Sequence, residues 1–320
     1  MNPSNARTDR NVRATLLKTT AAAFAALLAS LTPLAPLALH AQAPLTLRQQ
    51  NETALASAAT PLEKAIALDK LGRFPEALAL LRDAARLAPD DPVIQFNTAL
   101  VLDHNGDHAG ARQIYDTLLG RIQNIWQTYA KARKAGETPP KPGAADMRLV
   151  ALSNTLDENS AINYAFLGQY GKALSLFTLI HARGGAAGPD EMTNHAALWR
   201  LWLTAKLRAD EGMRSNVAID TLAGTLNAGT PYHEAMLKFY QGKLQWPELL
   251  AAISNMPADA LTKERYTTEA YFFAAGYFRY IKRDNETALK LLEARDALPY
   301  DGVIERLFIR DEIKSLKISR

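Results

Sequence analysis

The sequence predicts an all-α solenoid built from stacked antiparallel helix hairpins. Gly72 and Gly106 stand 34 residues apart, and a small residue follows each at the same offset, Ala77 and Ala111. A fixed period of this length is typical of stacked helix hairpins, because no single hairpin can bury its apolar face alone. Apolar residues between positions 78 and 87 recur at helical rather than alternating spacing, and no stretch of the chain has a clear strand pattern.

Prolines and glycines mark the expected ends of the helices. Pro61 and Pro92 stand at favoured first helical positions, while Gly72 and Gly106 supply the turns. After a weak helix within 44–60, we expect helices at about 61–71, 75–87, from 92 to the turn at 106, 190–207, 211–226, 232–241, 247–253, 263–282, 286–297 and 303–316.

A third hairpin turns at Gly168, out of register with the first two, because an insertion at about 121–153 precedes it. The first part, 121–135, extends the preceding helix. The proline-rich stretch 136–143 cannot be helical and must form a surface loop. The middle of the chain, about 186–262, is too divergent to assign as true repeats from the sequence.

Residues 1–41 have the order of a secretory signal peptide. Four basic residues and one acidic residue give the first 20 positions a charge of +3, out of +4 for the whole chain. An apolar run to Leu39 follows, and Ala41 supplies a small residue for cleavage before Gln42. The run also approaches the ~20 residues that span a bilayer, so an uncleaved anchor is the alternative. We therefore expect a periplasmic or secreted protein, or else one anchored in the inner membrane that faces the periplasm.

The composition excludes several function classes. Hydrophobic residues make up 48% and charged residues 22%, which is typical of a globular chain. Because the net positive charge is concentrated in the leader, it gives no reason to expect nucleic-acid binding. The absence of cysteine excludes disulfides, thiolate catalysis and cysteine-based zinc sites.

The hairpins resemble tetratricopeptide repeats (TPRs). That family places small residues at the eighth and twentieth positions of each repeat and a large apolar residue at the twenty-fourth. This chain has Ala65, Ala99, Ala161 and Gly276 at the eighth position, Ala77, Ala111, Ala173 and Ala288 at the twentieth, and Leu81, Tyr115, Phe177 and Leu292 at the twenty-fourth.

The resemblance implies that certain positions of the first helix of each repeat line a concave groove. The candidates for this groove are Leu62, Ile66, Phe96, Leu100, Asp103, Glu158, Ile162, Phe273, Tyr277 and Tyr280. These mainly apolar and aromatic residues suit a bound helix or extended peptide. They lack the Lys/Asn arrangement with which TPR chaperone cofactors bind a C-terminal carboxylate. The alternative is that several of them pack against neighbouring helices.

The second half of the chain resembles periplasmic TPR lipoproteins of the new lipoprotein I type. The likeness lies in the order and local pattern of 198–203, 238–243, 272–278 and 287–292. It implies an adaptor that brings cell-wall hydrolases together with a processing protease. The lipobox cysteine of those lipoproteins is missing, so lipid attachment is not expected.

No residue pattern indicates catalysis, a metal site or a cofactor site. His104 and His108 flank the turn at Gly106, where a solvated turn is the expectation, and Glu191 with His195 would supply only two metal ligands. Nucleophile and phosphate-binding motifs are also missing. We therefore expect a non-enzymatic exported scaffold that binds a protein or peptide, without a cofactor or small-molecule substrate, and that meets a membrane only if the leader stays uncleaved. The alternatives are an inner-membrane-anchored assembly factor or, least favoured, a cell-wall-active enzyme.

Overall fold

Several helices of the described chain begin at prolines or polar caps, and several of the turns between them contain a glycine with positive φ. The structure, a computed structural model, describes residues 46–184, 190–210, 218–226 and 228–318, which contain no strand. The predicted signal peptide and the first part of the helix expected at 211–226 lie outside these ranges. The described residues belong to one compact unit, Pro44–Arg320.

The first two hairpins have the predicted boundaries. Helix α2 (Leu47–Ser57) precedes α3 (Pro61–Lys70) and α4 (Phe74–Leu87), and then α5 (Pro92–His104) pairs with α6 (His108–Ala135). Thr60 and Glu63 form a capping box that satisfies backbone N–H groups at the start of α3. Gly72 and Gly106 have φ of 75° and 90°, which a residue with a side chain rarely adopts, so both tight turns favour glycine.

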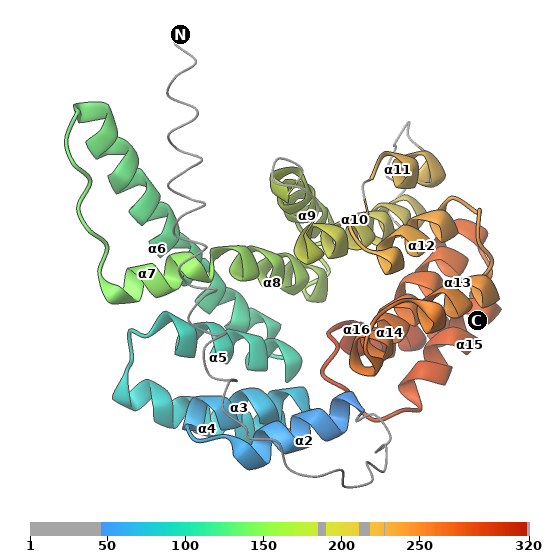
Figure 1. Cartoon of the computed structure of the whole chain (residues 1–320), viewed down its shortest axis with the longest axis horizontal. Helices are drawn as coiled ribbons and strands as arrows, with labels where there is room; N and C mark the ends of the chain where they lie inside the picture. Colours follow the sequence, from blue (N-terminus) through green and yellow to red (C-terminus); the bar gives the residue numbers. More distant parts are fainter. Residues whose placement is uncertain (1–45, 185–189, 211–217, 227, 319–320) are drawn as a thin grey trace, which may run out of the picture. The chain divides into compact units, whose positions relative to one another are not determined.

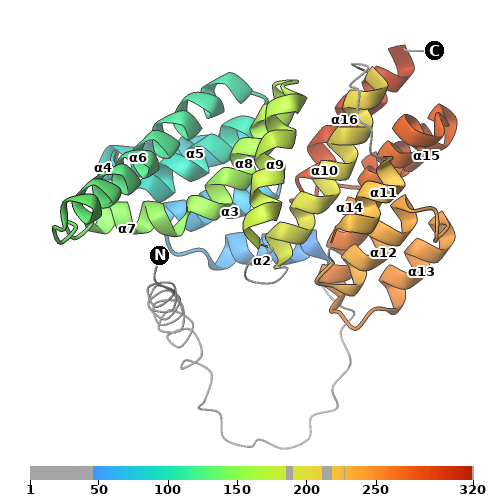
Figure 2. The ribbon, with the colours of Figure 1, turned by 90° about the horizontal axis from the view of Figure 1, so that it is seen from above.

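The insertion forms the predicted helix extension and exposed loop. Helix α6 is 28 residues long in total and ends at Gly136, whose φ of 73° lies in the left-handed region. A loop leads to α7 (Ala144–Ala151), after which α8 (Ser153–Phe166) and α9 (Tyr170–Gly184) form the third hairpin. Figure 2 shows α5, α8, α9 and α10 arranged side by side.

The C-terminal half packs around α10 (Glu191–Asp210), which contacts α9, α11, α12, α14 and η1. Trp199 and Trp202 of α10 are almost fully buried. The elements that follow α10 in Figure 1 are α11 (Ile219–Thr225), α12 (Pro231–Tyr240), α13 (Trp246–Asn255), α14 (Ala260–Gly276), the π-helix η1 (Tyr277–Lys282), α15 (Asn285–Asp296) and α16 (Glu305–Ile318).

The repeat positions expected from the sequence are confirmed as core positions. The alanines expected at the eighth and twentieth positions have no exposed surface, and the four residues at the twenty-fourth are at most 2% exposed. Gly276 is buried against Trp202, because a Cβ added to this glycine would lie 2.3 Å from the indole Cδ1. Small residues therefore set the close approach of the helices, as the repeat pattern requires.

Polar side chains link successive repeats. His104 Nδ1 lies 2.7 Å from Asp69 Oδ1, and His108 Nδ1 lies 2.9 Å from Asp103 Oδ1. Asn163 of the third repeat donates to the same Asp103 carboxylate at 2.7 Å. The turn that carries both histidines is therefore not simply solvated, because each ring bonds a carboxylate of a repeat helix.

The first helices contact α14 and the segment that precedes α16. Leu47 N donates to Glu264 Oε2 at 2.8 Å, and Asn51 Nδ2 donates to the carbonyl oxygen of Asp301 at 3.4 Å. The rings of Phe74 and Tyr300 meet edge to face with centroids 5.8 Å apart. The two ends of the described unit therefore touch each other.

The Asp301 carboxylate anchors this junction. It forms an ion pair with Arg295 and accepts the Thr268 hydroxyl at 2.9 Å. The Asp301 and Arg295 side chains are only 3% and 8% exposed. A charge buried in this way needs a hydrogen-bonded partner, because it has lost the stabilisation that water gave it.

No helix within the ranges that the structure describes has the length and apolar character needed to span a bilayer.

Candidate functional site

Three of the predicted groove residues lie in the packing between helices. Phe96 and Phe273 are 5% and 0% exposed, and the Phe273 ring meets Trp199 edge to face with centroids 5.7 Å apart. Asp103, 3% exposed, bonds His108 and Asn163. This burial corrects the expectation that these three side chains line an open face.

The other predicted groove residues divide into separate places. Tyr277 and Tyr280 are nearly buried and border a hollow that they share with α10 and α11. Leu62, Ile66 and Leu100 are half-buried on the helices of the first two repeats. The remaining two, Glu158 and Ile162 of α8, line a cleft with residues that the groove prediction did not include.

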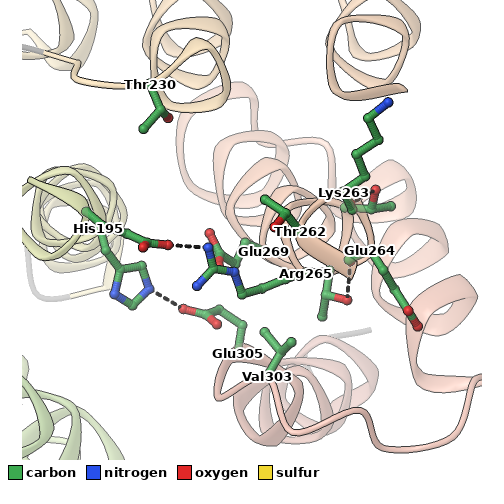
Figure 3. Close-up of polar contacts among 12 residues, drawn as sticks. His195, Thr230, Thr262, Lys263, Glu264, Arg265, Glu269, Val303 and Glu305 are labelled. Carbon is green, nitrogen blue, oxygen red and sulfur yellow. Dashed lines mark hydrogen bonds and ion pairs between the residues drawn. The ribbon is translucent and has the colours of Figure 1, made fainter. Parts of the chain in front are cut away.

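This cleft, of about 450 Å³, lies where several helices meet. Helices α8, α10, α12 and α14 and the segment 302–305 contribute to it. Figure 3 shows His195, Arg265, Glu269 and Glu305 grouped together, with Val303 beside Glu305. The cleft concentrates charged groups, and we treat it as the candidate binding site. Its lining residues are Glu158, Asn159, Ile162, Glu191, Met192, His195, His233, Arg265, Tyr266, Glu269, Gly302, Val303, Ile304 and Glu305.

His195 stands between two carboxylates. Its Nδ1 lies 2.8 Å from Glu158 Oε1, and its Nε2 lies 2.8 Å from Glu305 Oε1, the contact drawn as a dashed line in Figure 3. Burial alone would lower the pKa of His195, but the charge of Glu305 and the hydrogen bonds to both carboxylates raise it well above its usual value. The imidazole therefore bridges α8 to α16 through its two ring nitrogens.

Arg265 and Glu269 form the opposite part of the cleft. The Arg265 guanidinium pairs with the exposed Glu191 of α10 and lies 3.8 Å from Glu269 Oε1. Burial and the negative charge of Glu305 raise the pKa of Glu269 to about 8, although His195 and Arg265 act in the opposite direction. Glu269 is thus a buried carboxyl group whose nearest cation, Arg265, is shared with Glu191.

His233 of α12 contributes a neutral ring to the cleft lining. Its Nδ1 lies 2.7 Å from Thr230 Oγ1, while its Nε2 is buried without a hydrogen-bond partner. Burial, together with the positive charges of His195 and Arg265, lowers the pKa of His233 to about 3. The neutral imidazole offers one nitrogen atom as an acceptor.

Glu269 makes the stability of the protein depend on pH. An acid whose pKa is raised on folding binds its proton more tightly in the folded state, so its contribution to stability falls as pH rises. The window runs from about the unfolded value of 4.5 to about 8. The charged or titratable groups around it are Glu191, His195, Tyr232, His233, Arg265, Tyr266 and Glu305.

We therefore expect Glu269→Gln to lose less stability than the wild type between pH 5 and pH 9. The amide resembles the protonated acid but carries no titrating proton. Free energies of unfolding from urea titrations across this range measure the effect, with Glu137→Gln in the exposed loop as the control. Parallel stability curves for wild type and Glu269→Gln would contradict the assignment of a raised pKa to this carboxyl group.

Sequence reasoning found part of this site. Glu158 and Ile162 followed from their positions in a repeat helix, whereas Glu191 and His195 were considered as metal ligands and set aside because two ligands are too few. In the structure these two side chains bond different partners, Arg265 and the carboxylates around His195. Over the residues that are described, no group of three or more His, Asp or Glu is arranged to hold a metal ion.

The comparison with protein families agrees with the geometry of the first two hairpins. Residues 62–124 match the family described as tetratricopeptide repeat. The match runs from α3 into α6, the part of the chain in which two turns are separated by 34 residues. The curated proteins contain no match to this chain.

Proposed function

We propose that this chain, whose residues 62–124 are tetratricopeptide repeats, is an exported scaffold that binds a protein segment in the cleft between α8, α10, α12 and α14. One observation carries the proposal: Glu158, a predicted groove position of a repeat helix, lines that cleft together with the nearly buried Ile162. Repeats of this kind present side chains of successive helices to a partner. The partner is a peptide or protein, and the scaffold itself performs no catalysis.

Closing the cleft with a bulky side chain tests this proposal. Peptides selected from a displayed random library on the purified protein would be measured by fluorescence anisotropy. The half-buried Asn159 lines the cleft, so Asn159→Trp should weaken their binding at least about tenfold, since a large ring takes up the space. Asn124→Trp, on the exposed face of α6, is the matched control and should bind as the wild type does.

Two results would reject the proposal. One is that the library yields no binding peptide. The other is that Asn159→Trp and Asn124→Trp bind the selected peptides equally well.

Export is a separate part of the proposal. It rests on the basic start, the apolar run and the small residue Ala41 of the leader. Intact mass of the protein from an envelope fraction should give a mature chain that begins at Gln42. A chain that retains Met1 and fractionates with the inner membrane would instead support the anchored assembly factor.

A further inference from the structure

We propose that the cleft recognises a basic side chain, the guanidinium of arginine or the ammonium of lysine, on the bound segment. The inference rests on the proposed function, because it names the chemistry of the partner at the same site. It follows from four properties of the cleft: its excess of carboxyl groups, an unpartnered acceptor, apolar walls and a titrating acid.

Carboxyl groups outnumber cationic groups in the cleft. Glu158, Glu191, Glu269 and Glu305 line it, against His195 and Arg265. Each cation is shared between two of these carboxyl groups, His195 between Glu158 and Glu305 and Arg265 between Glu191 and Glu269. Among the described residues, the lining of the cleft contributes no third positive side chain. Glu269 and Glu305 are the buried members of the four carboxyl groups, and negative charges repel one another strongly where the local dielectric constant is low. A guest cation would relieve that repulsion, while an anionic guest would increase it.

His233 supplies an independent observation. The side chain is only 2% exposed, it lines the cleft, and its Nε2 has no hydrogen-bond partner. A buried polar atom left unpaired costs free energy, so such an atom in a native protein calls for an explanation. The neutral ring accepts an N–H hydrogen bond when Nδ1 carries its proton. A guanidinium or ammonium group carries such donors, with no acceptor in competition.

The walls of the cleft suit the rest of a basic side chain. Ile162, Met192 and Val303 are apolar residues beside the charged groups. Arginine and lysine bury a flexible hydrocarbon stem along apolar surface while their charged head stays in a polar environment. A bare metal ion would leave most of a cleft of about 450 Å³ empty and would use none of these walls.

The raised pKa of Glu269 gives the proposal a distinctive consequence. Burial and the charge of Glu305 keep this acid largely protonated near neutral pH. A guest cation placed beside it favours the ionised form, so binding should release a proton from Glu269. The charged or titratable groups that face Glu269 are Glu191, His195, Tyr232, His233, Arg265, Tyr266 and Glu305.

A matched pair of small probes tests the chemistry directly. N-acetyl-arginine N-methylamide carries the cation, and N-acetyl-citrulline N-methylamide has nearly the same shape without the charge. Methyl-selective NMR should show saturable shifts of the Ile162 and Met192 methyl groups with the arginine probe. The citrulline probe should bind at least about tenfold more weakly, because a hydrogen bond to a charged group is the stronger one. A lysine analogue distinguishes guanidinium from ammonium recognition.

Proton release and two variants complete the test. Titration calorimetry of the arginine probe at pH 7, in two buffers with different ionisation heats, should show proton release by the wild type. The Glu269→Gln variant should lose this release and bind more weakly at pH 8, where the wild-type acid ionises more readily. Glu158→Gln should also weaken binding, whereas Glu137→Gln in the exposed loop should not.

Equal binding of the arginine and citrulline probes, or an unchanged proton release in Glu269→Gln, would overturn the inference. The proposed function can fail separately. One such outcome is that selected peptides lacking arginine and lysine bind, and that Asn159→Trp abolishes this binding. This result would keep the proposed scaffold function and reject the inferred recognition of a basic side chain. Binding of the arginine probe alone, with no peptide bound, would preserve the cation site and reject the scaffold.

Discussion

Replacing Asp301 with asparagine is expected to lower the free energy of unfolding by about 3 kcal/mol. Asparagine keeps the shape of the side chain but removes the charge that pairs with Arg295. The guanidinium is 8% exposed and would remain buried without its counter-ion. Breaking one side of a buried ion pair costs far more than the pair contributes in net stability, because the remaining charge has already lost its water.

The contacts around Asp301 increase the expected effect. Its carboxylate also accepts the Thr268 hydroxyl at 2.9 Å. The substitution therefore weakens the contacts of this segment with α14 and α15, next to the main-chain carbonyl of residue 301 that accepts Asn51 Nδ2 of α2. Urea unfolding followed by circular dichroism measures the loss.

The matched control for Asp301→Asn removes an exposed ion pair. Glu52→Gln breaks the contact of Arg48 Nε with Glu52 Oε1, at 3.1 Å on the surface of α2, and should cost at most about 0.5 kcal/mol. Equal losses in Asp301→Asn and Glu52→Gln would show that the buried pair does not hold the junction.

Gly276→Ala is expected to destabilise the protein by about 2 kcal/mol, against the normal preference of helices for alanine. The added Cβ would lie 2.3 Å from Cδ1 and 2.4 Å from Nε1 of Trp202. Trp202 cannot easily move, because its ring packs against Phe272 and Tyr280 at centroid distances of 5.1 and 5.8 Å. The clash must therefore be relieved by moving α14 away from α10.

Gly120→Ala is the control for this prediction. Gly120 lies inside α6, and a Cβ there meets nothing within 4 Å. Alanine should stabilise that helix by up to about 1 kcal/mol, because it restricts the unfolded chain more than glycine does. If both alanine variants gained stability, the close approach of α14 and Trp202 would be contradicted.

The sequence predicted the parts of the fold that depend on neighbouring residues. Gly72, Gly106 and Gly168 were expected as turns, and all three have positive φ in the structure. The small residues that separate paired helices, such as Ala77 and Ala288, were expected in the core and are fully buried. These features follow from spacing within one hairpin, so a single sequence is sufficient to predict them.

The candidate site was predicted only in part because its residues come from distant parts of the chain. Glu158 and Ile162 followed from repeat positions, but His195, Arg265 and Glu305 lie on elements outside the regular pair of hairpins. Phe273 was expected in a groove because repeat helices usually present that position to solvent. Here α10 packs against α14 and covers it, which no local pattern could indicate.

The contact between the two ends of the unit has a consequence for how the chain folds and comes apart. An open stack of repeats folds from any point and frays from its ends, because every contact is local. Asn51 and Asp301 are 250 positions apart, and closing so long a loop is entropically costly and slow. Once it has formed, this contact ties α2 to the segment before α16, so unfolding cannot begin at α2 without breaking it. A protease that cuts once in the exposed loop at 137–143 should therefore leave two fragments that remain associated through two interfaces.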